Sequence, residues 1–153
     1  MPKAACSYEK SFGDIRCLIV DTNLYIDWLN AGKYEPILFQ PDAVKFMSAV
    51  VMMELLAGAH SALDQRRLQD LFRTFARLDR IVTPSSGTYQ EAGEVLQQLQ
   101  TTHRYHLRQC HSLTNDVLIA LSARTIGGTV VTRNKRDFLA IQSLRSFKLS
   151  LVA

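Results

Sequence analysis

Three carboxylates interrupt apolar stretches of this chain at positions where a charge is costly to bury. Asp21 ends the apolar run at 17–20, Glu54 lies inside the segment VVMMELLAG, and Asp116 opens the segment NDVLIALSA. A buried carboxylate needs a partner, and clustered carboxylates raise one another's pKa unless a cation neutralises them. Carboxylate oxygens suit Mg²⁺ or Mn²⁺. The pattern therefore indicates a divalent-metal site, if the fold brings the three acids together.

Each of these positions also has an ordinary structural explanation. Glu54 would be the one solvent-facing residue of a buried helix, and Asp116 would cap a helix or complement its dipole. Asp137, in the segment TRNKRDF, would be a first-turn acid of the last helix, and Asn134 would be a turn residue or helix cap. The residue types taken one at a time leave both explanations open.

The hydrophobic pattern predicts alternating strands and helices that would position these side chains. Strands are expected at 16–20, 44–48, 80–83, 129–131 and 147–152, and helices at 22–30, 49–59, 65–78, 88–100, 114–125 and 136–142. Strands separated by helices form a parallel sheet that is covered on both faces. We therefore predict one three-layer α/β/α domain over residues 15–153, with a central parallel sheet of four to five strands. Residues 1–14 are expected to be an N-terminal extension.

Two polar segments follow predicted strands directly. Asp21 comes after the first strand, and Thr132, Arg133 and Asn134 come after the fourth. In parallel α/β sheets, ligands bind outside the carboxyl ends of the strands, near the point where the strand order reverses. This edge of the sheet is where we expect the chemistry.

Composition places broad limits on function. The chain has 153 residues, of which 47% are hydrophobic and 21% charged, and a formal net charge of +4. These values are typical of one globular domain. No apolar run is long enough to span a bilayer, and the first residues lack a signal-peptide pattern, so we expect a cytoplasmic protein without a membrane partner. The charge permits a nucleic acid or an acidic protein as partner, and equally fits a solvated surface rich in arginine.

The segment HRYHLRQCH, at 103–111, allows three interpretations. Its three histidines and Cys110 suggest zinc, but their spacing matches no standard zinc finger. Tyr105 would stack on an unpaired base if this were a basic RNA-binding loop. A plain surface loop is the third interpretation, and the pattern favours it.

Four segments occur in an order that is more specific than any one of them: IVDTNLYIDWL, VMMELLAG, LTNDVLIALSA and VVTRNKRDF. This ordered set resembles the four motifs of the PIN-domain ribonucleases and, more narrowly, those of VapC-type toxins. The resemblance runs from about Cys17 to the C-terminus. It implies a metal-dependent endoribonuclease whose catalytic, metal-binding acids are Asp21, Glu54 and Asp116, with Mg²⁺ or Mn²⁺ as cofactor. The family's fourth acidic position falls on Asn134, which weakens the case for a second metal ion.

Other residues near these motifs receive supporting roles. The resemblance implies that the hydroxyls of Thr22 and Thr132 support the acids. Asn115 would orient the neighbouring acid or hold a phosphate, and Asp137 would act through a water molecule. Three basic residues are candidates for holding RNA phosphates, with a solvated helix start as the alternative: Arg133, Lys135 and Arg136.

Three functions remain open from the sequence. The resemblance favours the toxin of a toxin–antitoxin pair, neutralised by an acidic VapB-like antitoxin, and it implies a homodimer. A PIN-fold ribonuclease of RNA maturation, without an antitoxin, is the second. The third is a receiver-like phosphoacceptor with Asp21 as the phosphorylated residue. A receiver usually has an acidic pair on its first strand and a lysine after its last strand, and this chain has neither.

Overall fold

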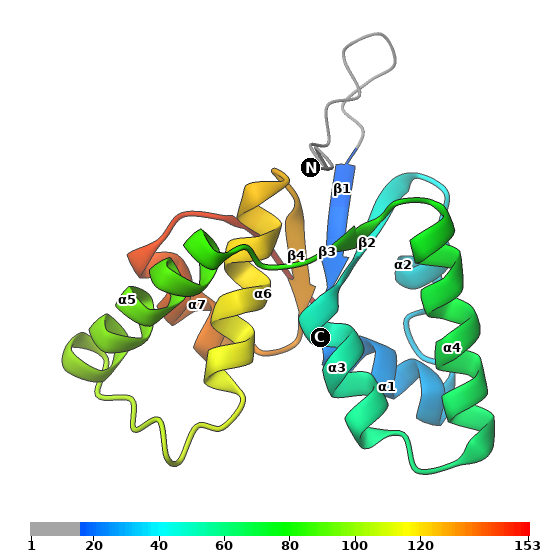
Figure 1. Ribbon diagram of the computed structural model, residues 1–153, viewed down its shortest axis with the longest axis horizontal. Coiled ribbons are helices and arrows are strands. Elements are labelled where there is room, and N and C mark those ends of the chain that lie inside the picture. The colour runs from blue at the N-terminus through cyan, green and yellow to red at the C-terminus, as the bar shows by residue number, and fades with distance from the viewer. Residues whose placement is uncertain (1–15) are drawn as a thin grey trace, which may run out of the picture.

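A computed structural model describes residues 16–153 (Figure 1), and the predicted extension at 1–14 lies outside this range. The strands are β1 (Arg16–Val20), β2 (Ala43–Ser48), β3 (Ile81–Val82), β4 (Thr129–Thr132) and β5 (Lys148–Leu151). The helices are α1 (Thr22–Ala31), α2 (Glu35–Phe39), α3 (Ala49–Gly58), α4 (Ala62–Arg77), α5 (Ser86–Thr102), α6 (Leu113–Thr125) and α7 (Lys135–Leu144). None of these helices is long and apolar enough to cross a membrane, within the described range.

All five described strands run parallel, in the order β3-β2-β1-β4-β5. The chain adds strands in one direction from β1 to β3, and then returns to place β4 on the other side of β1. The strand order therefore reverses between β1 and β4, which is where parallel sheets bind ligands. The predicted parallel sheet of four to five strands is confirmed.

Helices cover both faces of this sheet. Figure 1 shows α5, α6 and α7 together on one side, and α1, α3 and α4 on the other. The core lies between these layers, where the central strands contribute Ile19 and Val130, both fully buried, and α6 is buried from Asp116 to Ala123. A continuous apolar run of this kind is expected for elements covered on both sides. The predicted three-layer α/β/α architecture is confirmed.

Local capping accounts for the two largest differences from the predicted helix starts. Helix α4 begins three residues earlier than predicted, because the Ser61 hydroxyl accepts a hydrogen bond from the backbone N–H of Asp64 at 3.0 Å. Helix α5 begins two residues early because Ser85 caps it in the same way. Such serine caps stabilise a helix start. The short helix α2 was not predicted: Pro36 lies in its first turn, where a missing N–H costs nothing.

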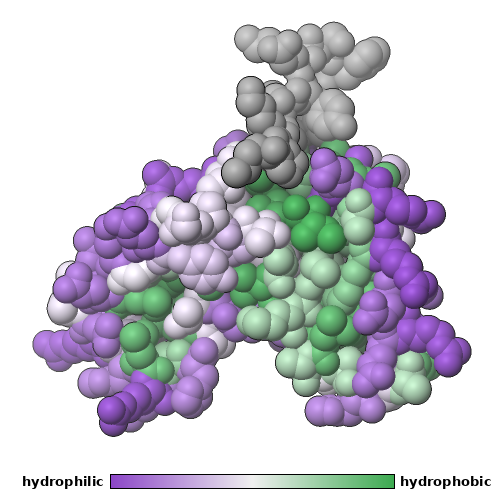
Figure 2. Space-filling model, viewed as in Figure 1, coloured by the Kyte–Doolittle hydropathy of each residue, from purple (hydrophilic) through white to green (hydrophobic). Residues whose placement is uncertain are grey.

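The surface differs between neighbouring helices. Figure 2 shows polar side chains along α4 and apolar side chains over α3, where Met53 and Leu56 are exposed. The same view shows a hollow along the lower edge, between the two groups of helices. Strands β1 and β4 point their carboxyl ends toward that edge (Figure 1). The fold thus exposes the switch point of the sheet on a concave part of the molecule.

Candidate active site

Asp21 is held at the switch point by hydrogen bonds from two different elements. It follows β1 and caps α1, where its Oδ1 accepts from the backbone N–H of Thr22 at 2.8 Å. Its Oδ2 accepts from the Thr132 hydroxyl of β4 at 2.6 Å and from the Asn23 amide at 3.1 Å. Burial raises the pKa of Asp21, the Thr132 hydrogen bond opposes that rise, and the nearby Glu54 carboxylate adds to it.

Glu54 reaches the same place from α3. Its side chain is half-buried, and its Oε1 accepts a hydrogen bond from the Thr22 hydroxyl at 2.8 Å. Helices α1 and α3 pack against each other, so this bond joins two neighbouring elements. Glu54 is therefore not simply the solvent-facing residue of a buried helix. Thr22 links it to Asp21 by offering its backbone N–H to one acid and its hydroxyl to the other.

Asp116 lies in the first turn of α6 and is only 5% exposed. The N-cap position of this helix belongs to Ser112, so Asp116 does not serve as the cap. Its Oδ2 accepts from the Asn134 amide at 3.2 Å. Burial, followed by repulsion from the carboxylates of Asp21, Asp137 and Glu54, raises the pKa of Asp116 to about 8. A divalent cation bound beside this carboxyl group would favour the carboxylate form and displace its proton to solvent.

Asn134 joins Asp116 to a further acid. Its amide nitrogen donates to Asp116 and also to Asp137 Oδ2 at 2.9 Å, while its Oδ1 accepts from the backbone N–H of Asp137 at 3.3 Å. That last bond caps α7, so the structural explanation of Asn134 is confirmed, and its catalytic role stays a prediction. The hydrogen bond between the Asn134 and Asp137 side chains is direct, and the predicted action of Asp137 through a water molecule stays a prediction. Thr132 accepts from the backbone N–H of Asn134 at 3.0 Å.

Comparison with protein families identifies this arrangement. The family model described as PIN domain matches residues 18–143, which include every carboxylate of the site. The chain belongs to the PIN-domain family. A search of curated proteins found no match. This membership makes a nuclease the expected class of enzyme.

Solved structures show the same fold. A chain of VapBC2 from Rickettsia felis, bound to a promoter DNA fragment, is 22% identical with a TM-score of 0.64, over 90% of this chain and 99% of that one. A chain of DNA-bound VapBC from Salmonella typhimurium is 20% identical with a TM-score of 0.63, over 89% and 98%. A chain of FitAcB from Neisseria gonorrhoeae is 20% identical with a TM-score of 0.61, over 86% and 95%.

The basic residues of this PIN domain differ in how they are held. Arg133 forms an ion pair with Asp27 of α1, with 3.0 Å between its Nε and the carboxylate oxygen, and remains 44% exposed. Lys135 and Arg136 are exposed at the start of α7. Asn115 is half-buried beside Asp116 in sequence, but no hydrogen bond joins its side chain to the acids in the described part of the chain. The predicted roles of these four residues stay predictions.

The interpretation of Tyr105 as a residue that stacks on an RNA base does not fit this conformation, and the favoured interpretation, a surface loop, does. Its ring is buried, and its hydroxyl donates to Asp137 Oδ1 at 2.7 Å. The ring is therefore turned inward toward α7. His103 forms hydrogen bonds with the hydroxyls of Thr102 and Ser143. The segment is a surface loop in which the Tyr105 side chain is buried. Through its hydrogen bond to Asp137, Tyr105 contacts the candidate site, which the sequence did not predict.

Asn23 is a second site residue that the sequence did not single out. Its amide nitrogen donates to Asp21 and, at 3.4 Å, to the Thr132 hydroxyl. Its Oδ1 is buried without a hydrogen-bond partner, the only such side-chain atom among residues 16–153. A buried acceptor without a partner is unfavourable. In the sequence, the signal that could have identified Asn23 as a site residue was its position directly after Asp21 and Thr22.

The oxygen atoms available as metal ligands at the site fit a divalent cation. They belong to the buried carboxylates of Asp21 and Asp116, to the Glu54 carboxylate and to the Asn23 amide, whose Oδ1 has no hydrogen-bond partner. These are hard oxygen ligands, and a cation would relieve the repulsion that raises the pKa of Asp116. Within residues 16–153, no three His, Cys, Asp or Glu side chains are already arranged to hold a metal ion. The set of three carboxylate ligands therefore stays a prediction. Mg²⁺ sites in proteins commonly retain several water molecules as ligands.

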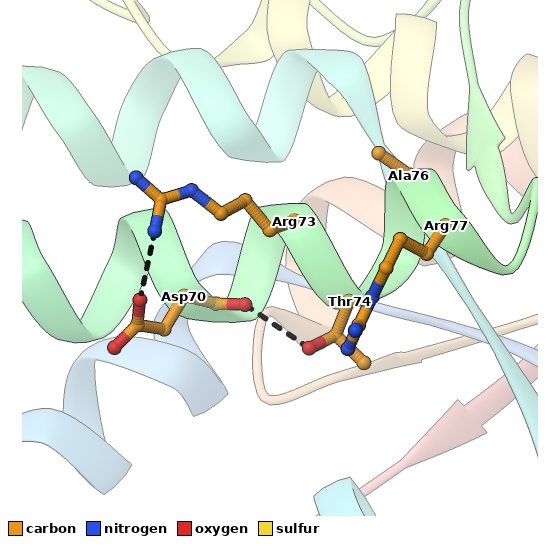
Figure 3. Close-up of a pocket in the computed structure, with 5 residues that line it drawn as sticks. All are labelled: Asp70, Arg73, Thr74, Ala76 and Arg77. Atoms are coloured by element: carbon orange, nitrogen blue, oxygen red, sulfur yellow. Dashed lines mark hydrogen bonds and ion pairs between the residues drawn. The ribbon is translucent and has the colours of Figure 1, made fainter.

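A depression elsewhere on the surface offers no comparable chemistry. It measures about 540 Å³ and is lined entirely by residues of α4: Asp70, Arg73, Thr74, Ala76 and Arg77. Figure 3 shows Asp70 paired with Arg73, at 3.4 Å, and its backbone oxygen accepting from the Thr74 hydroxyl. The polar groups of this depression mostly satisfy one another on an exposed helix face. None of its lining residues belongs to the carboxylate site.

Proposed function

We propose that this PIN domain is a Mg²⁺- or Mn²⁺-dependent endoribonuclease and the toxin of a type II toxin–antitoxin system. The single observation that carries the proposal is the buried pair Asp21 and Asp116 at the switch point of the sheet, with Asp116 at a pKa of about 8. Burial and the Asp21 carboxylate both raise the pKa of Asp116, and a buried carboxyl group perturbed in this way marks a candidate functional site that a cation would stabilise. Family membership supplies the reaction class.

The protein groups have separate tasks in this mechanism. Asp21 and Asp116 would hold the cation, and Glu54, positioned by Thr22, would complete its surroundings directly or through water. A bound divalent ion supplies an acidified water molecule and stabilises negative charge on the phosphoryl group. Hydrolysis forms a bond between the water oxygen and phosphorus, breaks the bond to one ribose oxygen, and transfers a proton to that leaving oxygen. Hydrogen bonds from Thr132 and Asn134 keep the two aspartates oriented throughout.

The exposed basic residues beside the acids would bind the RNA backbone. Lys135 and Arg136 are solvent-exposed at the first turn of α7. Arg133 would exchange its Asp27 carboxylate for a phosphate, which binds a guanidinium in a similar way. These contacts explain affinity for a polyanion rather than a preference for sequence.

An antitoxin partner is supported by the solved relatives and by charge. The similar chains come from VapBC and FitAB complexes. The net charge of +4 favours an acidic partner, and such a VapB-like segment would compete with RNA for the same basic residues. We also propose that the toxin acts in the cytoplasm as a homodimer.

The proposal is tested by expression and by cleavage in vitro. Expression of the wild type in bacteria should arrest growth, and co-expression with the neighbouring gene should restore it. Purified protein should cleave RNA with Mg²⁺ or Mn²⁺ but not in EDTA. Asp21→Ala and Asp116→Ala should lower cleavage at least about a hundredfold and remove toxicity, while Asp70→Ala on the exposed face of α4 should change neither.

Full cleavage in EDTA, or by both aspartate variants, would refute the metal mechanism. Cleavage without growth arrest would instead favour the ribonuclease of RNA maturation over the toxin. The experiment therefore separates the chemistry of the site from its biological use.

A further inference from the structure

Tyr105 is the buried anchor of an otherwise exposed loop. Its side chain is 6% exposed, whereas its neighbours Arg104 and His106 are exposed. Arg104 has a φ of 56°, in the left-handed region that residues with a side chain seldom adopt. The backbone N–H of Tyr105 donates to Leu99 at the end of α5. The loop thus adopts an unfavourable backbone angle next to the residue that it turns inward.

The Tyr105 hydroxyl begins a continuous chain of hydrogen bonds that ends at a predicted catalytic acid. It donates to Asp137 Oδ1 at 2.7 Å, and Asp137 Oδ2 accepts from the Asn134 amide at 2.9 Å. The same amide nitrogen donates to Asp116 Oδ2 at 3.2 Å. The chain therefore connects three elements, namely the loop after α5, the start of α7 and the first turn of α6.

Each link restricts the next one. With Tyr105 on one oxygen and Asn134 on the other, the Asp137 carboxylate has a defined orientation, and this orientation directs one amide hydrogen of Asn134 toward it. The second amide hydrogen is then available for Asp116. The Tyr105 ring is held in place from outside by Arg136, whose guanidinium lies 5.2 Å from the ring centroid. Burial and the Asp137 contact raise the pKa of Tyr105 to about 12, so the hydroxyl remains a donor over the range of pH in which proteins work.

We propose that Tyr105 is a positioning residue of the active site, which orients Asp116 through Asp137 and Asn134 without contacting the substrate. This inference rests on the proposed nuclease function for its kinetic consequence, but the hydrogen-bond chain itself can be tested in the metal-free protein. It assigns a role to a loop that lies outside the four acidic motifs.

The first test is structural and independent of activity. In ¹⁵N–¹H spectra of the full-length, metal-free protein, the side-chain amide of Asn134 is identified by its loss in Asn134→Ser. Tyr105→Phe removes one oxygen atom and should shift both proton resonances of that amide. Tyr89→Phe, the same change at an exposed tyrosine of α5, should leave them in place. Unshifted Asn134 resonances in Tyr105→Phe would overturn the proposal.

The second test is kinetic, with an RNA oligonucleotide and Mn²⁺. Tyr105→Phe should lower kcat about tenfold and change KM less than about twofold, because the substrate does not touch the hydroxyl. In an Asp137→Ala background the same change should lower kcat less than about twofold, since the link is already broken. Equal losses in both backgrounds, or an unchanged kcat, would refute the inference. An inactive wild type would refute the proposed function instead and leave the spectroscopic test valid.

Discussion

Asp116→Asn should stabilise the metal-free protein, and the gain should grow with pH. The folded-state pKa of Asp116, about 8, lies above the ordinary value for an aspartate, about 3.9. A group with a raised pKa contributes its full stability below the unfolded pKa and loses it as the pH rises through the folded pKa. The difference is about four units at about 1.4 kcal/mol each, so the wild type should lose on the order of 5 kcal/mol between about pH 4 and pH 8.

The substitution removes this titration and retains an oxygen that accepts from the Asn134 amide. For a domain of this size, about 5 kcal/mol corresponds to a difference of roughly 10–20 °C in Tm at pH 8.5, with a much smaller difference at pH 5. The assay is thermal unfolding in EDTA from pH 5 to pH 9, with Asp70→Asn as a control because that carboxylate is exposed. Added Mn²⁺ should raise the Tm of the wild type at pH 8.5 more than that of Asp116→Asn.

Parallel pH profiles for the wild type and Asp116→Asn would refute the reasoning, because they would show that Asp116 ionises without cost in the fold. A gain of equal size in Asp70→Asn would refute it as well, since relief of general surface charge would then explain the effect.

Three further predictions concern neighbouring side chains. Asn134→Asp adds a negative charge beside Asp116 and should tighten Mn²⁺ binding in calorimetry; unchanged affinity would show that Asn134 does not limit metal binding. Thr132→Val removes the donor to Asp21 from a fully buried position and should cost about 1–3 kcal/mol in urea unfolding, with Thr129→Val as the milder control. Arg133→Gln should raise KM for RNA several-fold and flatten its salt dependence, whereas Arg73→Gln should do neither.

The sequence by itself determined the elements and the edge of the sheet at which the candidate site lies. Apolar runs and helical stripes are local patterns, so they predicted the strands and all of the longer helices. They also placed Asp21 directly after β1 and Asn134 two residues after the end of β4. The ordered motifs predicted the family. The short helix α2 was missed because Pro36 reads as a breaker, although the first turn of a helix accepts it.

Only the tertiary structure decided how the site residues act on one another. Tyr105 and Asp137 are 32 residues apart in sequence. No local sequence pattern predicts that a loop buries a tyrosine ring against a carboxylate so distant along the chain. The raised pKa of Asp116 likewise depends on burial and on three acids from other elements. Such contacts arise from the packing of α6 and α7 on the sheet. Desolvation and electrostatic repulsion depend on distances in space, whereas hydrophobic periodicity depends on spacing along the chain.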